Sequence, residues 1–321
     1  MKKVKYILAS AILALSSTAN AESLKVHTFL PSTDLHLKAF KEFIEETPSI
    51  KYDIFPSSQL GGSALDFVYQ PKDKISDVVF GVTSYSQSVF PKLSVLELPG
   101  VLTKNDLEVN ICVIDKFIAS HSDTGWSDLV KPIAVFDHPE YRLYTNKKVE
   151  NLEDLKGLKI RVPSTISSKV FDKLEAEPIG MPISAALEAL ASGVVDGVIL
   201  NRSIAHVLKI NELAPYELTF RDNISKTILF WGIGYEQYND LTDVSKNEFD
   251  QAATLLKKHE ANIQFVYDDE LVREEYSLSE ADNNKVKEKL DEVAMEWVKN
   301  QNDFDGLALY NDAKEFMKSC Q

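Results

Sequence analysis

Short apolar runs and amphipathic stretches alternate along the first hundred residues. Residues 25–30, 51–56 and 77–82 are rich in β-branched and apolar side chains and are predicted to be strands. An amphipathic helix is predicted over 33–46, and a shorter helix over 63–70. This order predicts a β-α-β-α-β unit, and therefore a parallel sheet with helical crossovers.

The same pattern recurs after residue 150. Strands are predicted at 158–163, 177–182 and 194–200, with helices over 165–176 and 185–192 between them. Ser164 and Ser184 precede these helices as N-caps, and Gly193 ends the second one. A helical stretch (104–120) and a strand (131–137) separate the two units, so we expect two similar α/β lobes.

Downstream of residue 201 the pattern becomes mostly helical. Helices are predicted over 205–213, 243–260, 280–300 and 304–318. The apolar run 226–235 is predicted to be a strand, and its distance from the second unit favours a return to the first lobe. The chain is thus predicted to be a two-lobed α/β protein with a long helix late in the sequence.

The first 21 residues have the three-part layout of a secretory signal peptide. Lysines lie at the start, an apolar run follows from Tyr6 to Leu15, and the segment ends in Ala-Asn-Ala. We expect cleavage between Ala21 and Glu22, which would export a mature chain of 300 residues to the periplasm. The apolar run is too short for a retained membrane anchor.

The net charge of the chain is strongly negative, which restricts the partners that it can bind. The formal net charge is −14, and without the three leader lysines it is 32 − 49 = −17. An acidic surface argues against nucleic acid and against anionic lipid as partners.

The chain contains two cysteines, Cys112 and Cys320. In an oxidising compartment they permit one disulfide, although two separate thiols fit the sequence equally well. Two cysteines do not make a structural zinc site, and the six histidines show no ligand spacing, so no metal and no cofactor is expected.

Motifs of several enzyme classes are missing. The sequence has no Gly-x-Ser-x-Gly, no Gly-x-Gly-x-x-Gly and no phosphate-binding Gly-x-x-x-x-Gly-Lys loop. This favours a binding protein over an enzyme.

Arg161 lies where the predicted strand 158–163 ends. Ligands of open α/β sheets bind outside the carboxyl ends of the strands, and a guanidinium matches a carboxylate with two parallel donors. A salt bridge to an internal acid would explain the residue equally well.

The stretch from Leu152 to Asn201 resembles the substrate-binding proteins of the DctP type, which serve TRAP (tripartite ATP-independent periplasmic) transporters. The segments LEDLKGLKIRVP and ALASGVVDG carry the resemblance, and FPSSQLGG and the region 89–102 add to it. It implies a two-lobed periplasmic-binding-protein fold with a hinge. It also implies a monomer that captures a small organic acid and passes it to the small and large TRAP membrane subunits.

The resemblance also implies a division of the chain and a set of site residues. Lobe I would comprise 22–139 and 227–267, and lobe II 140–226 and 268–321. Arg161 would hold the ligand carboxylate, Arg142 would be a second arginine, and Asn201 would add a polar contact. Four further residues are expected to line the ligand, with the tryptophan favoured among them: Phe29, Phe80, Ile183 and Trp231.

Two departures from the family pattern bear on the ligand. Val82 stands where sialic-acid-type members carry glutamate. The four candidate wall residues named above favour an apolar or aromatic monocarboxylate over a sugar acid. Arg202 follows Asn201, and either a site role or a surface role fits it. A lyase-type periplasmic enzyme and a sensory receptor on the same scaffold remain alternatives to transport.

Overall fold

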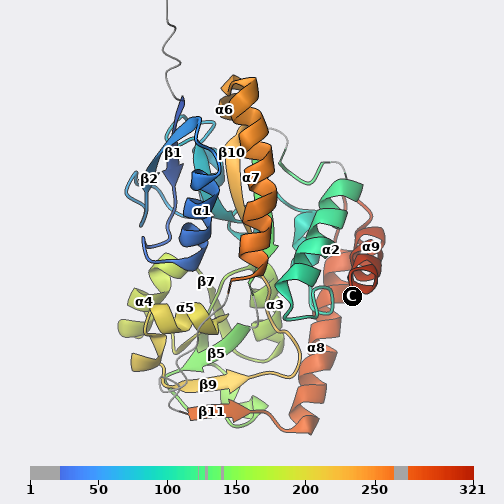
Figure 1. Ribbon diagram of the computed structural model, residues 1–321. Helices are drawn as coiled ribbons and strands as arrows, with labels where there is room; N and C mark the ends of the chain where they lie inside the picture. The colour runs from blue at the N-terminus through green and yellow to red at the C-terminus, as the bar shows by residue number, and fades with distance from the viewer. Residues whose placement is uncertain (1–21, 122, 127–128, 139–140, 264–273) are drawn as a thin grey trace, which may run out of the picture.

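The computed structural model describes residues 22–121, 123–126, 129–138, 141–263 and 274–321, and the predicted signal peptide lies outside these residues. Two β-sheets form the centres of two lobes, one above the other in Figure 1. The predicted two-lobed α/β fold is confirmed.

The first lobe contains a five-stranded sheet in the order β2-β1-β3-β10-β4. Its strands are β1 (Glu22–His27), β2 (Ile50–Phe55), β3 (Val78–Val82), β4 (Val130–Asp137) and β10 (Ile228–Gly234). β1 runs parallel to β2 and β3. β10 lies in this first sheet, as its distance from the second unit predicted, and it runs antiparallel to β3 and β4. The helix predicted over 63–70 is only a 3₁₀ turn, η1 (Phe67–Tyr69), because its backbone bonds join residues three apart.

The second lobe contains a six-stranded sheet in the order β11-β9-β5-β8-β6-β7. Its strands are β5 (Tyr141–Thr145), β6 (Lys159–Val162), β7 (Glu177–Gly180), β8 (Gly197–Asn201), β9 (Tyr216–Thr219) and β11 (Glu274–Ser277). β6 pairs in parallel with β7 and β8, which completes the second β-α-β-α-β unit.

Helices cover both sheets. They are α1 (Leu35–Glu45), α2 (Leu107–Ser120), α3 (Thr165–Lys173), α4 (Ile183–Ala191), α5 (Arg202–Val207), α6 (Tyr235–Asp240), α7 (Asp243–Ala261), α8 (Glu280–Lys299) and α9 (Gly306–Ser319). Figure 1 shows α1 and α7 side by side on the first lobe, and α8 running along the second lobe towards α9. Ser164 caps α3 as predicted, whereas α4 begins one residue before Ser184 and has Pro182 as its N-cap.

The chain passes between the lobes from β4 to β5 and again from β9 to β10. Lys226 lies at the second passage and donates to Asp137 Oδ2 (2.6 Å) and to the carbonyl of His138 (3.0 Å), at the first. Asn110 of α2 donates to the same carboxylate oxygen. Both charged side chains are buried, so this ion pair holds the two hinge segments together.

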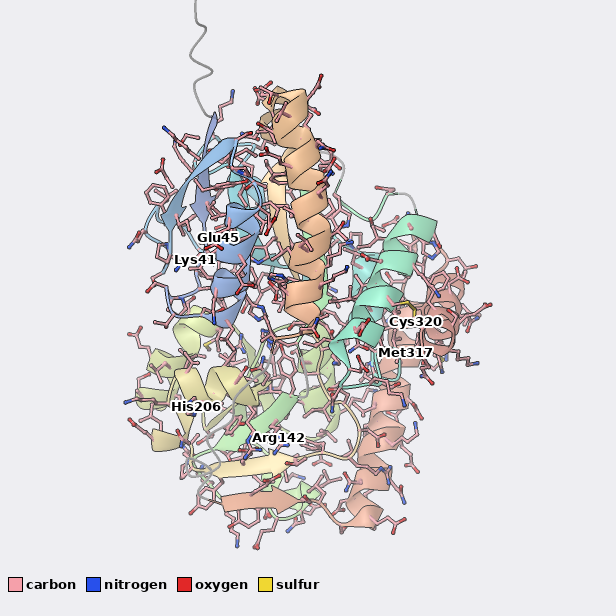
Figure 2. The ribbon with its side chains drawn as sticks, in the orientation of Figure 1. Lys41, Glu45, Arg142, His206, Met317 and Cys320 are labelled. Carbon is pink, nitrogen blue, oxygen red and sulfur yellow. A yellow bond between two sulfur atoms is a disulfide. The ribbon has the colours of Figure 1, made fainter. Side chains whose placement is uncertain are left out.

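The end of the chain returns to the first lobe. Helix α9 packs against α2, and a disulfide joins Cys112 of α2 to Cys320, with a Cα–Cα distance of 6.0 Å (Figure 2). Part of segment 268–321 therefore contacts lobe I, while β11 lies in the sheet of lobe II. The predicted lobe boundaries stay a prediction.

The disulfide closes a loop of 208 residues, and its loss should destabilise the protein. Replacing both cysteines by serine should lower the free energy of unfolding by about 2–5 kcal/mol, measured by urea denaturation. Reductant should weaken the parent to the same extent and leave the double variant unchanged. Mass spectrometry that found two free thiols in the unreduced parent would refute the bond.

Removing one partner of the buried Lys226–Asp137 ion pair should lower the free energy of unfolding. Lys226→Met leaves the Asp137 carboxylate buried without its cation, so unfolding should become easier by about 3–5 kcal/mol in chemical denaturation. Lys156→Met is the matched control, because the Lys156–Glu175 pair is about two-thirds exposed on both sides, and its denaturation midpoint should stay unchanged. Equal midpoints for both variants would contradict this role of Lys226.

Candidate functional site

A cavity of about 60 Å³ lies between the lobes. The first lobe contributes the residues just after β1 and residues from β3, the 3₁₀ turn η2 (Thr83–Ser86) and β10, and the second lobe contributes residues from β5, β6, β8, α5 and the start of α4. The lining residues are Phe29, Leu30, Phe80, Val82, Tyr85, His138, Tyr141, Arg161, Pro163, Ile183, Leu200, Asn201, Ile204, Thr227 and Leu229. The parallel strands β1, β3, β6 and β8 meet the cavity at their carboxyl ends, where α/β sheets bind ligands.

Arg161 projects from β6 into this boundary and is 2% exposed. Its Nε donates to the carbonyl of Met181 (2.9 Å), its Nη1 to the carbonyl of Ile199 (3.3 Å), and its Nη2 to the hydroxyl of Tyr85 (3.3 Å). All three acceptors are neutral. No carboxylate of the described residues forms an ion pair with this guanidinium, so the internal salt bridge left open by the sequence is not present there.

The other lining residues add little charge. Burial lowers the pKa of His138 well below its usual value, and the nearby His36 and Lys226 lower it further, so its imidazole is neutral. Among the lining residues, all of which the structure describes, Arg161 is the one permanently charged side chain. A buried cation without an anionic partner attracts an anion from solution, because desolvation strengthens the pairing.

The walls of the cavity are mostly apolar. Phe29 and Phe80 lie edge to face with ring centroids 5.4 Å apart, and Ile183 lies at the first turn of α4. The structure brings these three predicted residues to the same cavity as Arg161. Small apolar ligand groups fit such walls.

Asn201 also lines the cavity, but its amide is largely engaged. It is the N-cap of α5, accepts from the backbone N–H of Ile204 (2.8 Å) and bonds to His138 Nδ1 through its Nδ2. Its main local effect is to hold the helix and the imidazole in place.

Arg142 does not reach the cavity. Its side chain bonds to Glu217 of β9 (2.5 Å) and Glu275 of β11 (2.9 Å) within the second sheet, as Figure 2 places it. Successive side chains of a strand point to opposite faces, and the preceding residue, Tyr141, is the one that lines the cavity. The structure therefore does not bring this predicted residue to the site.

Trp231 does not reach the cavity either. Its indole is fully buried in the first lobe, stacked on Phe40 at 4.1 Å and packed against Phe80, and its Nε1 donates to Glu260 (3.3 Å). The tryptophan expected to contact the ligand is thus a core residue behind the cavity wall.

Sequence reasoning missed four polar lining residues: Tyr85, His138, Tyr141 and Thr227. Tyr85 lies three residues after β3, where a third strand of a β-α-β-α-β unit ends. The other three lie at the two hinge passages, and the Tyr141 and Thr227 hydroxyls are hydrogen-bonded to each other. The carboxyl end of the third strand was therefore a usable signal, whereas the hinge positions depended on tertiary structure.

Comparison with known proteins bears on the family and the fold of the chain. Residues 30–303 match the model of the DctP family, described as bacterial extracellular solute-binding protein, family 7. An uncharacterized protein of Haemophilus influenzae is 30% identical over 212 residues, which are 60% of this chain and 60% of that protein. The chain thus matches well under two-thirds of that relative's length.

Two solved structures are similar over nearly the whole chain. One is a marine metagenome TRAP solute-binding protein of an unidentified microbe, specific for aromatic acid ligands and complexed with metahydroxyphenylacetate. It is 25% identical, with a TM-score of 0.82 and coverage of 94% of this chain and 99% of that one. The other, from Rhodoferax ferrireducens with copurified benzoate, is 23% identical with a TM-score of 0.82, covers 93% and 98%, and supports the fold.

A buried acid next to the hinge predicts a pH-dependent stability. Glu97 accepts bonds from Thr83 Oγ1 (3.3 Å) and from the backbone N–H of Ile228 (3.2 Å), and burial raises its pKa to about 8. Between an unfolded pKa near 4.5 and the folded value, the folded protein holds a proton that the unfolded chain releases. The free energy of unfolding should therefore fall as pH rises from about 5 to about 8.

Urea denaturation of Glu97→Gln across pH 5 to 9 measures this contribution. Relative to the parent, the free energy of unfolding of the variant should fall less between pH 5 and 8, and the raised pKa values of His36, Asp137 and Glu260 account for the slope that remains. Glu175→Gln is the control, because a hydrogen bond from Lys156 lowers the pKa of this exposed carboxyl, and the slope should survive there. Parallel profiles for the parent and Glu97→Gln would show that Glu97 is ionised in the folded protein.

Proposed function

Because the chain belongs to the DctP family of bacterial extracellular solute-binding proteins, we propose that it captures a small monocarboxylate between its two lobes. The observation that carries this proposal is the Arg161 guanidinium, buried at the cavity and bonded only to neutral acceptors among the described residues. A carboxylate would supply the missing negative charge and would match the planar donor fork.

The charge and size of the cavity restrict the ligand further. A single permanent positive charge balances one carboxylate, and a second carboxylate in the same small cavity would be buried without a cation. The aromatic and aliphatic walls favour an apolar body. The aromatic acids bound by the marine metagenome and Rhodoferax proteins have this combination of one carboxylate and one apolar ring.

The mechanism is capture by closure of the lobes. With the lobes apart, Arg161 faces water, and the ligand carboxylate binds it there. When the lobes close about the two chain passages joined by Asp137 and Lys226, water leaves the cavity and the ion pair between Arg161 and the ligand carboxylate becomes stronger. No bond of the ligand is made or broken, as expected of a family of transport receptors.

The partners follow from the family. We infer that the liganded protein acts in the periplasm and delivers its ligand to TRAP-type membrane subunits. None of the helices in the described part of the chain is both long and apolar enough to cross a bilayer. The experiments below also test two alternatives. In one the protein is a sensory receptor that uses the same closure, and in the other it is a lyase that acts on the bound acid.

Arg161→Ala should abolish binding of small monocarboxylates. A thermal-shift screen with benzoate, 3-hydroxyphenylacetate, 4-methylpentanoate and succinate selects the acid, and calorimetry measures its affinity. A ligand at a hundred times its Kd stabilises the folded state by about 2.7 kcal/mol, which raises the melting temperature of the parent but not of the variant. Benzamide, the neutral analogue of benzoate, should stabilise neither protein.

Arg142→Ala is the matched control, since it removes an arginine that lies outside the cavity. It should retain the affinity of the parent for the selected acid. An Arg161→Ala variant that binds as the parent does would refute the carboxylate site. Recovery of a chemically altered acid after incubation would favour an enzyme, and neighbouring genes for a sensor kinase instead of membrane subunits would favour a sensory receptor.

A further inference from the structure

The hydroxyl of Tyr85 bridges the two lobes. Its ring packs in the first lobe, with the Phe29 centroid 6.2 Å away, and its oxygen faces the second lobe. There it accepts from Arg161 Nη2 (3.3 Å) and from the backbone N–H of Ile183 (2.9 Å). One side chain of lobe I thus contacts two separate elements of lobe II, β6 and α4.

Both donors to the Tyr85 oxygen are positively polarised. Arg161 carries a full charge, and Ile183 is the first residue of α4, where the helix dipole places partial positive charge. The N-cap of α4 is Pro182, which forms no side-chain cap bond. The Tyr85 oxygen of the opposite lobe therefore accepts the hydrogen bond from the Ile183 N–H, in the place of a capping side chain.

After these two contacts, the O–H of Tyr85 is the part of the hydroxyl that remains available for a hydrogen bond. A tyrosine hydroxyl offers two acceptor positions and one O–H donor, and both acceptor positions are occupied. The O–H donates to no acceptor among the described residues, and Tyr85 lines the same cavity as Arg161. An ionised carboxylate is purely an acceptor, so it fits an O–H and a guanidinium side by side.

We propose that Tyr85 is a second carboxylate-binding residue, contributed by the lobe opposite Arg161. It donates its O–H to one oxygen of the ligand carboxylate while its own oxygen stays bonded to Arg161 and Ile183. This inference rests on the proposed function, since it requires a carboxylate at Arg161.

The arrangement links recognition of the carboxylate to closure. The Tyr85 oxygen reaches Arg161 and Ile183 only when the lobes are together, so the complete set of donors exists only in the closed form. A carboxylate held by both residues stabilises that form, whereas a neutral amide lacks the charge that makes both bonds strong. Tyr85 thereby favours a charged ligand over a neutral one and favours the closed form of the protein.

Tyr85→Phe tests this directly, because it removes the hydroxyl and keeps the ring packed on Phe29. Hydrogen bonds to charged groups imply that calorimetry with benzoate and 3-hydroxyphenylacetate should show a Kd about 10- to 100-fold weaker than that of the parent. Arg161→Lys keeps a positive charge and a measurable affinity, and in that background the same change should weaken binding less than in the parent, because the planar donor fork beside Tyr85 is gone. A purely structural tyrosine would not show this coupling.

Tyr52→Phe is the matched control, since this tyrosine bonds to Thr47 in the first lobe outside the cavity, and it should bind benzoate as the parent does. Parent affinity in Tyr85→Phe would overturn the role of Tyr85 and leave the site at Arg161 standing. A parent that bound none of the acids would overturn the proposed function, and the role of Tyr85 with it.

Discussion

The structure depends on a positive charge that is buried without a negative partner of its own among the described residues. Removing a guanidinium from water costs several kcal/mol, and two backbone carbonyls and a phenol recover only part of that cost. Apolar walls on both sides raise the cost further, because they offer no other solvation. An anion in the cavity would offset the remaining cost, which is the physical basis of the capture that we propose.

The rest of the fold places and protects this cation. Parallel strands end at the cavity from both lobes, so Arg161 and Phe80 meet although they lie on different sheets. The Lys226–Asp137 pair joins the two chain passages beside the cavity. The Cys112–Cys320 disulfide fixes the end of α9 to α2, and neither cysteine lines the cavity.

The sequence predicted the periodic parts of this protein well. Alternation of apolar and polar residues identified the second β-α-β-α-β unit, the strands and first helix of the first unit, and the returning strand 226–235, whereas the helix predicted over 63–70 is a 3₁₀ turn. The strands β5, β9 and β11 were not predicted, because they lie outside the alternating strand–helix order that identified strands of the same length, such as β6 and β7. The position of Arg161 at a strand end left a ligand contact and an internal salt bridge equally open, and the family resemblance favoured the ligand contact.

The remaining site residues could not be identified without the tertiary structure. Arg142 and Tyr141 are neighbours, and only the register of β5 decides which of them faces the cavity. Trp231 lies on a strand next to the site, but α1 and α7 cover its face of the sheet. The bridging role of Tyr85 depends on how the two lobes meet, which no local pattern records.

A crystal structure of the protein grown with benzoate tests the central claim most directly. The account predicts both carboxylate oxygens in the interlobe cavity, with at least one about 2.8 Å from a terminal nitrogen of Arg161. Benzoate bound elsewhere, with that guanidinium turned to an acid of the protein, would contradict it.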